Sequence, residues 1–460
     1  MQVPFSLISL GCAKNQVDSE IMIGHMKAAG FDFREQSGAA KILIINTCAF
    51  IDPAKQEAID TIFAAARARE EGEAPADQLI IVAGCLSQRY AKDLVKLMPE
   101  VCCFVGVDMI CRIAEIAQAC LDGTNEKIYS TKVSSFLPDT GLARYRLSPA
   151  HYAYVKIAEG CNHACAYCVI PRIRGGHRSR PQANIVREVR ELVAQGVKEI
   201  NLIAQDTTYY GMDRWEKRAT KTSGVDSSRG ESLASLLREL NAIPGEFWIR
   251  VLYTHPAHWS RELIDTFATC DKVVKYVDIP LQHVADHILD EQRRKTDGDT
   301  IRRLIRDLRA AVPGIGIRTT FISGLPGETE EDHLELKEFV SEFRFERAGV
   351  FPYSKGEGSL AARMPHQVHA ATMKRRANEI SMLMAGIADE LGQEAVGTTM
   401  RVLVDAPGLA RGAWDAPDVD ACIHVDPALP VGEFADVEIA DAIAYELFAE
   451  GAEELPGEEL

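Results

Sequence analysis

Short, continuously apolar runs recur along the first hundred residues, and each of them ends in a cysteine. The runs are FSLISLGC, KILIINTC and QLIIVAGC, which end in Cys12, Cys48 and Cys85. Runs of this length that are rich in Ile, Leu and Val are typical of buried parallel strands. The segment 18–29 opens on Asp18-Ser19 and stops at Gly30, a pattern that predicts a helix. The alternation predicts a parallel α/β domain over residues 4–122.

A second series of strand and helix patterns follows residues 123–146, which lose periodicity and are predicted to be a linker. Helix 184–195, for example, carries one apolar stripe. The polar stretch 212–231 interrupts the series and is predicted to be a surface excursion. Strands are predicted at 152–158, 199–205, 247–254, 274–280, 316–323 and 348–353. Six such units predict a parallel sheet curled into a full or partial (β/α)6 barrel over residues 147–386.

The last part of the chain changes pattern again. Residues 389–460 contain short alternating segments, MRVLVD, CIHVD and EFADVEIADAIAYEL, with glycine and proline between them. Such segments predict a small antiparallel β-barrel. The predicted fold class is therefore α/β, with a parallel α/β domain, a central barrel and a small carboxyl-terminal β-barrel.

Cys161, Cys165 and Cys168 follow the first strand of the predicted central barrel with the spacing C-x3-C-x2-C. A structural zinc ion wants four protein ligands, whereas a cubane iron–sulfur cluster held by three cysteines leaves one iron open. A zinc-bound scaffold or assembly protein remains the non-enzymatic alternative.

The earlier cysteines form a second triplet. Ligands of parallel sheets gather beyond the carboxyl ends of the strands, so Cys12, Cys48 and Cys85 are predicted to face one crevice. The alternative is three unrelated buried cysteines, which does not explain why each follows a strand.

Polar or glycine-rich residues follow the other predicted barrel strands. They are Gln205-Asp206, His255, Gln282-His283, the stretch GLPGET at 324–329, and Tyr353-Ser354. Barrel enzymes carry their chemistry at this end of the strands. Each residue alone is as readily a structural one, but together with a cluster they predict a binding mouth.

Charge separates the carboxyl-terminal domain from the rest. Residues 400–460 hold two basic residues, Arg401 and Arg411, and fifteen acidic ones, a net charge of −13 out of −16 for the chain. A domain that binds RNA presents Lys and Arg to phosphates, so RNA is a poor partner here and a basic protein a better one. The alternative is that the acidic residues merely keep the surface solvated. No signal peptide and no apolar run of about 18 residues is visible, so the protein is predicted to be cytoplasmic, with no membrane partner.

The C-x3-C-x2-C motif with Tyr167 before its last cysteine resembles the radical S-adenosylmethionine (SAM) superfamily. Together with the upstream triplet, it resembles the methylthiotransferases. The amino-acid sequences of four segments are similar to those of the branch that modifies the twelfth protein of the small ribosomal subunit. They are SLGCAKNQVDSE, HYAYVKIAEGCNHACAYCVIPRIRGGHRSR, YVDIPLQH and TFISGLPGETEED. Two departures are Gln292, where the branch has methionine, and DAPDVDACIHV at 415–425, where it has glycine after the motif's second aspartate.

This resemblance implies a radical SAM methylthiotransferase with two 4Fe–4S clusters and a TRAM-type substrate-binding domain at 389–460. Cys161, Cys165 and Cys168 would hold the cluster that generates a 5′-deoxyadenosyl radical, and Cys12, Cys48 and Cys85 the cluster that presents sulfur. Two SAM molecules would serve, and Tyr167, Gln205, Arg318, Gly324 and Glu328 are candidate contacts to them. The substrate would be the β-carbon of an aspartate in that ribosomal protein, free or in the subunit, and a reductant protein would supply electrons. The alternative with the same chemistry is methylthiolation of an adenosine in transfer RNA.

Overall fold

The computed structural model describes residues 2–131, 133–139 and 141–452. The chain forms two compact units. The amino-terminal unit comprises residues 1–147, 158–180 and 354–362, and the barrel unit comprises 148–157, 181–353 and 363–460. The C-x3-C-x2-C loop thus belongs to the amino-terminal unit, although it follows a barrel strand. The predicted domain boundaries remain predictions, and the end of the predicted carboxyl-terminal domain, 453–460, lies outside the described residues.

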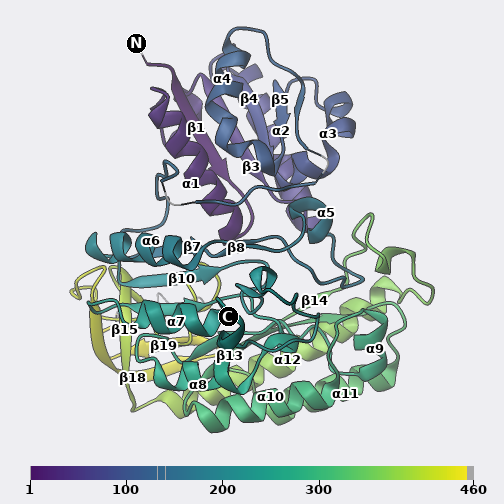
Figure 1. Ribbon diagram of the computed structural model, residues 1–460, viewed down its shortest axis with the longest axis vertical. Helices are drawn as coiled ribbons and strands as arrows, with labels where there is room; N and C mark the ends of the chain where they lie inside the picture. Colours follow the sequence, from purple (N-terminus) through teal and green to yellow (C-terminus); the bar gives the residue numbers. More distant parts are fainter. Residues whose placement is uncertain (1, 132, 140, 453–460) are drawn as a thin grey trace, which may run out of the picture. The chain divides into compact units, whose positions relative to one another are not determined.

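The amino-terminal unit is built on one six-stranded, wholly parallel sheet with the order β2-β1-β3-β4-β5-β6 (Figure 1). Its strands are β1 (Pro4–Ser9), β2 (Asp32–Phe33), β3 (Ile42–Thr47), β4 (Leu79–Gly84), β5 (Cys103–Val105) and β6 (Ile128–Tyr129). The helices are α1 (Ala13–Ala28), α2 (Asp52–Glu70), α3 (Cys85–Leu97), α4 (Ile113–Leu121) and α5 (Ile170–Arg174). The predicted α/β domain is confirmed. Helix α1 begins directly after Cys12, which is earlier than the start of the predicted helix 18–29.

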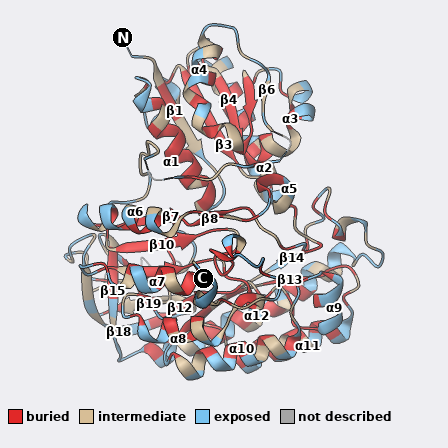
Figure 2. Cartoon of the chain, in the orientation of Figure 1, coloured by how far each residue is buried: buried red, intermediate tan, exposed pale blue. Residues whose placement is uncertain are grey.

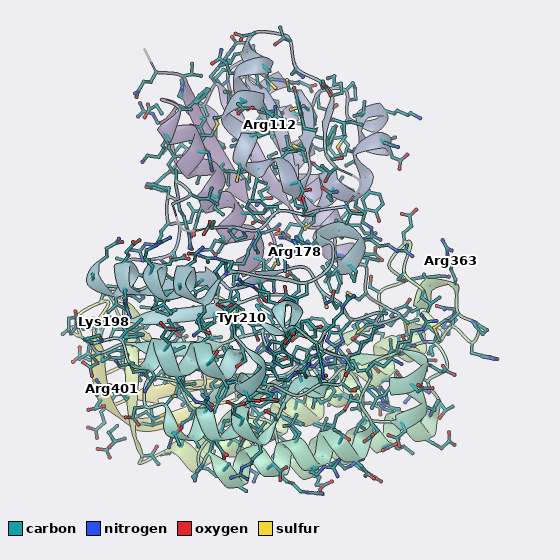
Figure 3. The ribbon with its side chains drawn as sticks, viewed as in Figure 1. Arg112, Arg178, Lys198, Tyr210, Arg363 and Arg401 are labelled. Carbon is teal, nitrogen blue, oxygen red and sulfur yellow. The ribbon has the colours of Figure 1, made fainter. Side chains whose placement is uncertain are left out.

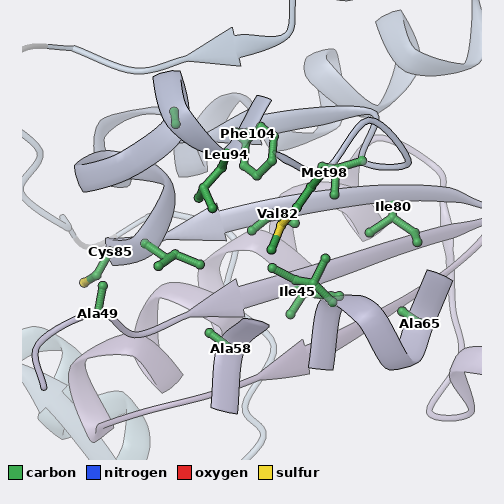
Figure 4. Close-up of a cluster of buried hydrophobic side chains, with 14 of the residues drawn as sticks. Ile45, Ala49, Ala58, Ala65, Ile80, Val82, Cys85, Leu94, Met98 and Phe104 are labelled. Carbon is green, nitrogen blue, oxygen red and sulfur yellow. The ribbon is translucent and has the colours of Figure 1, made fainter. Parts of the chain in front are cut away.

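Two apolar clusters, one on each face, enclose this sheet. The residues of the central strand β3 alternate between them: Leu43 and Ile45 join one cluster, and Ile42 and Ile44 the other. Such burial on both faces explains why the strands read as continuous apolar runs. Figure 2 shows β3 buried throughout and β4 buried after its first residue, Leu79, and Figure 4 shows Cys85 at the margin of the first cluster.

The barrel unit carries the six predicted parallel strands in two groups, β11-β10-β7 and β12-β13-β14. A bridge between Ile249 and Val273 joins the groups. The strands are β7 (Tyr152–Lys156), β10 (Glu199–Ile203), β11 (Trp248–Val251), β12 (Tyr276–Asp278), β13 (Gly316–Ser323) and β14 (Arg347–Pro352). The helices are α6 (Gln182–Ala194), α7 (Leu233–Asn241), α8 (Arg261–Thr269), α9 (Asp286–Glu291), α10 (Gly298–Ala311), α11 (Glu330–Phe343) and α12 (Ala370–Ala395). The predicted partial barrel is confirmed.

The polar excursion 212–231 lies less on the surface than its composition suggests. Met212, Trp215 and Val225 are buried in it. The Trp215 indole donates to the backbone oxygen of Glu231 at 2.9 Å, so the segment folds back on itself. Sparse apolar residues therefore give it a small core of its own.

The carboxyl-terminal domain is a closed five-stranded barrel with the order β15-β16-β17-β19-β18. Its strands are β15 (Thr399–Ala406), β16 (Leu409–Arg411), β17 (Ile423–His424), β18 (Phe434–Ile443) and β19 (Glu446–Ala449). The predicted small barrel is confirmed, with one difference: β17 and β19 pair in parallel. Among the described residues, no helix is both long and apolar enough to cross a membrane.

Candidate functional site

Cys12, Cys48 and Cys85 lie at one edge of the amino-terminal sheet. Strands β1, β3 and β4 are neighbours, and Cys48 and Cys85 directly follow the last residues of β3 and β4. The register pairs Ser9 with Asn46 and Thr47 with Gly84, so all three strands end at the same level. The structure therefore brings this predicted triplet together, at the edge where parallel sheets bind ligands.

A glycine in the left-handed region precedes three of the six predicted cluster ligands. The φ angles are +94° at Gly11, +94° at Gly84 and +81° at Gly160. A Cβ would lie 2.7 Å from Cβ of Cys48 at Gly11, 2.3 Å from Oδ1 of Asn46 at Gly84, and 2.2 Å from the oxygen of Gly176 at Gly160. Each glycine lets the chain turn sharply where the strand ends and the ligand begins.

The charges around the first triplet suit thiolate ligands. Burial by itself raises the pKa of the Cys12 thiol, but Lys14 and Arg174 outweigh it and hold that pKa below its ordinary value. Burial raises the pKa of Cys48 and brings that of Cys85 to about 12, and the neighbouring thiols add to both shifts. No disulfide joins any of the cysteines in the described part of the chain. Three convergent soft ligands beside two cations fit an iron–sulfur cluster, whose ligands must be thiolates.

The second triplet lies on the loop between the short strands β8 (Ala158–Glu159) and β9 (Arg178–Ser179). This loop also contains helix α5, which begins just after the triplet. Backbone N–H groups already point at two of its sulfurs: His163 N lies 3.4 Å from Sγ of Cys161, and Ile170 N lies 3.5 Å from Sγ of Cys168. Such donors favour negatively charged sulfur. Val169 and Ile173 anchor the loop in the core cluster around β3 and β4.

Arg174 lies on the loop of the second triplet and contacts Cys85 of the first. Its guanidinium contacts both carboxylate oxygens of Glu159 at 3.1 Å, and donates to Oδ2 of Asp18 at 3.0 Å and to Oδ1 of Asn15 at 2.6 Å. It also donates to Sγ of Cys85 at 3.5 Å. One buried cation on the radical SAM loop thus reaches a predicted ligand of the other cluster. Hydrogen bonds to cluster sulfurs tune reduction potential, which gives this contact a chemical consequence.

The sequence did not identify three of these residues as part of the site: Asn15, Asp18 and Arg174. Asn15 donates to the backbone oxygen of Thr47 at 3.0 Å and so joins the turn after β1 to the turn after β3. The signal that could have found them is the set of polar residues within the segments CAKNQVD and PRIRGG. A polar residue on a helix face that packs against a sheet requires a partner, but the sequence does not say which one.

The other predicted cofactor contacts are divided between the units. Tyr167 lies on the cysteine loop of the amino-terminal unit. Gln205 follows β10, and Gly324 and Glu328 follow β13, all at the carboxyl ends of barrel strands. These three residues therefore lie at the end of the barrel where enzymes of this architecture have their active sites.

Glu328 has local partners in the GLPGET turn. Its Oε2 accepts from the backbone N–H of Gly324 at 2.6 Å and of Leu325 at 3.1 Å, and its Oε1 accepts from Arg376 at 2.9 Å. Gly324 has φ +82°, and a Cβ there would lie 2.3 Å from Cγ of Met373. Glu328 therefore holds the turn in shape.

Arg318 is engaged at the other end of the barrel. It lies near the start of β13, where its guanidinium pairs with Asp278 at 3.0 Å and with Asp420 at 3.1 Å. The sequence alone suggested a cofactor contact here. These two carboxylates instead give Arg318 a structural function, because they neutralise it inside the barrel.

Asp420 belongs to a buried polar layer, which we call the floor network. It joins residues 411–420 of the carboxyl-terminal domain to the strands of the central barrel near their amino ends. Its contacts are Arg347 with Asp415 at 3.0 Å, Tyr276 with Asp420 at 2.9 Å, Tyr154 with Asp418 at 2.9 Å, and Glu199 with Arg250 and Arg411 at 2.7 Å each. Asp415 and Asp420, two of the fifteen acidic residues between 400 and 460, are thus internal ion-pair partners.

Three family models match the chain in the order of its domains. They are the uncharacterized protein family UPF0004 at residues 5–106, the radical SAM superfamily at 155–340 and the TRAM domain at 396–451. Membership of the radical SAM superfamily implies a 4Fe–4S cluster and SAM. Among solved structures, the radical SAM methyltransferase TsrM from Kitasatospora setae with tryptophan and a SAM analogue bound is similar in fold. Its TM-score is 0.53 at 15% identity, over 91% of this chain and 80% of that one.

Curated relatives match from end to end. The ribosomal protein uS12 methylthiotransferase RimO of Akkermansia muciniphila is 59% identical over 98% of this chain and 100% of its own. That of Opitutus terrae is 51% identical over 97% and 96%. The two cysteine triplets, the partial barrel and the carboxyl-terminal barrel agree with these matches, and the chain belongs to the ribosomal protein uS12 methylthiotransferase (RimO) family of radical SAM enzymes.

Proposed function

We propose that this enzyme attaches a methylthio group to the β-carbon of an aspartate in ribosomal protein uS12. The observation that carries the proposal is the presence of two cysteine triplets in one compact unit, where Arg174 on the loop of the second triplet donates to Cys85 of the first. A radical enzyme that only removed hydrogen would need one triplet. The second gives the chain a place to hold sulfur, and the similar relatives are named as methylthiotransferases.

In this proposal Cys161, Cys165 and Cys168 hold one 4Fe–4S cluster, and Cys12, Cys48 and Cys85 hold a second. When bound, the first supplies the electron that cleaves SAM and the second a coordination position for sulfur. The chain provides three thiolates at each site. The glycines before Cys12, Cys85 and Cys161 and the N–H donors at the loop fix where those thiolates point.

The proposed SAM contacts are Tyr167 beside the cysteines, and Gln205 and Gly324 at the carboxyl ends of β10 and β13. Glu328 acts as a positioning residue, because its carboxylate holds the backbone of the GLPGET turn. Arg318 is left out of the set, because its charge is neutralised by Asp278 and Asp420.

We further propose that exposed carboxylates of the carboxyl-terminal barrel attract the basic surface of a ribosomal protein. Strand β18 presents Asp436, Glu438 and Asp441 to solvent, while Ile439 and Ala442 face the core. Of the two basic residues in this domain, Arg411 is buried in the floor network, and Arg401, which is labelled in Figure 3, pairs with Glu246 and Asp436. The surface of the domain therefore stays negative, which favours a cationic protein over RNA.

The remaining parts of the proposal are a cytoplasmic location and a reductant protein as electron donor. Modification of an adenosine in transfer RNA, the alternative in the same chemistry, gains no support from the relatives, which are named for uS12.

The test is a reaction with cluster-loaded enzyme, reductant, sulfide and SAM carrying a labelled methyl group. Free uS12, the small ribosomal subunit and unmodified transfer RNA are supplied in separate reactions. We expect mass spectrometry to find the labelled methylthio group on one aspartate of uS12, in at least one of its two states, and none on RNA. Label on transfer RNA with none on uS12 would replace the proposal by its alternative.

A further inference from the structure

The outer face of the carboxyl-terminal barrel carries three metal-ligand side chains that neither cluster uses. Strands β17 and β19 pair in parallel, with Ile423 opposite Leu447 and His424 opposite Phe448. Ile423 and Leu447 point inward and belong to the barrel core. Because side chains alternate along a strand, the flanking residues on the opposite face are Cys422, His424, Glu446 and Phe448.

Three of these side chains converge. One ligand atom each from Cys422, His424 and Glu446 lies within 4.8 Å of the others. The Nε2 of His424 is 3.0 Å from Oε2 of Glu446. The imidazole stacks on the ring of Phe448, with centroids 4.5 Å apart and planes 6° from parallel. The stack fixes the plane of the imidazole, and the ring edge faces the carboxylate.

We propose that Cys422, His424 and Glu446 form a zinc site. Zinc binds thiolate sulfur at about 2.3 Å, imidazole nitrogen at about 2.0 Å and carboxylate oxygen at about 2.0–2.2 Å, in tetrahedral geometry. Ligand atoms around such an ion lie roughly 3–4 Å apart by these lengths, so small changes of side-chain rotamer bring the three atoms into place.

The ligand types select the metal. A thiolate and an imidazole favour zinc over magnesium or calcium, which prefer oxygen ligands throughout. The side chain of Glu446 is 46% exposed and that of His424 15%, so an ion can enter from solvent. The domain's net charge of −13 between residues 400 and 460 raises the local concentration of cations.

Three protein ligands leave the fourth position to water. The site also links β17 to β19, a pair held by only two register positions. Zinc would therefore stabilise the pairing of β17 with β19 in the closed barrel, independently of the clusters.

The test is element-specific, because zinc can also enter empty cluster sites. The full chain with both clusters assembled is incubated with zinc and freed of excess by gel filtration. Zinc per chain is then measured by mass spectrometry, and its ligands by X-ray absorption at the zinc edge. We expect one zinc per chain with one sulfur at about 2.3 Å and two or three nitrogen or oxygen ligands at about 2.0–2.1 Å.

Cys422→Ser and His424→Gln should each lower bound zinc at least tenfold, and Cys422→Ser should also remove the sulfur from any residual zinc. Cys270→Ser, a buried cysteine of the same unit, is the matched control and should keep full zinc. Both site residues lie on the outer face, and the conservative Glu446→Gln checks the result if either variant unfolds. A zinc spectrum with three or four sulfurs, or equal zinc in wild type and Cys422→Ser, would overturn the proposal.

Discussion

Replacing Arg174 by methionine tests whether the link between the two cysteine triplets is structural. Methionine keeps an apolar side chain of similar length but removes the guanidinium. The carboxylates of Asp18 and Glu159, 3% and 1% exposed, then remain buried without their cation. Removing one partner of a buried ion pair costs about 3–5 kcal/mol. The opening equilibrium of the amino-terminal unit should therefore rise roughly a hundred- to a few thousand-fold, at about 1.4 kcal/mol for each factor of ten.

Hydrogen exchange measured by mass spectrometry is the suitable assay. All four tryptophans, at 215, 248, 259 and 414, lie in the barrel unit, so tryptophan fluorescence would report on the other unit. Peptides covering β1, β3 and β4 report on the sheet that carries Cys12, Cys48 and Cys85. Arg172→Met is the matched control, because Arg172 lies on the same helix but is exposed and bonds only to the backbone oxygen of Gly358.

The reasoning also predicts a rescue. Adding Asp18→Asn and Glu159→Gln to Arg174→Met removes the uncompensated charges and should recover at least half of the lost protection. If Arg174→Met exchanged within threefold of Arg172→Met, the buried ion pairs would not hold this unit together.

Three further predictions address the clusters, a buried histidine and the acidic strand. Cys165→Ala should abolish reductive cleavage of SAM but retain about four irons. Cys48→Ala should keep SAM cleavage and lose sulfur insertion. Loss of SAM cleavage in a folded Cys48→Ala protein with its other cluster intact would refute the proposed division of functions between the two clusters. Burial lowers the pKa of His283 to about 4, so as pH falls below about 6.5 the unfolded chain takes up the proton first. The free energy of unfolding of the barrel unit should then drop by about 3 kcal/mol between pH 7 and pH 4, and His283→Gln should flatten that part of the profile measured by tryptophan fluorescence. Neutralising Asp436, Glu438 and Asp441 together should weaken binding of uS12 at low salt and reduce its salt dependence; an unchanged salt dependence in titration calorimetry would exclude steering by β18.

The sheets and the placement of the first cysteine triplet were predictable because they depend on local pattern. A strand buried on both faces must be apolar along its whole length, and Cys12, Cys48 and Cys85 stand directly after such runs. Because parallel strands end at a common edge, position along the chain was enough to place the three residues together.

Ion pairs between distant segments were not predictable in the same way. Asp415 and Asp420 look like surface charges in an acidic sequence, yet Arg347, Arg318 and Tyr276 bind them inside the barrel unit. A charged residue reads as exposed unless its partner is known, and the partners here lie 68 to 144 residues away. For the same reason, the ion pairs of Arg318 with Asp278 and Asp420 were not foreseen when the resemblance made it a candidate contact to SAM.

The floor network has a consequence for the order in which the protein is made. The strands of the central barrel are complete at Pro352, but Asp415, the carboxylate partner of Arg347, and Asp420, the second carboxylate partner of Arg318, arrive only with residues 415–420. A ribosome adding 5–20 residues per second needs roughly 3–14 s to bridge that interval. During this time Arg347 lacks its carboxylate partner, and Arg318 has Asp278 alone. A stop codon before the last domain would therefore leave the Arg347 guanidinium without Asp415 at the base of the central barrel.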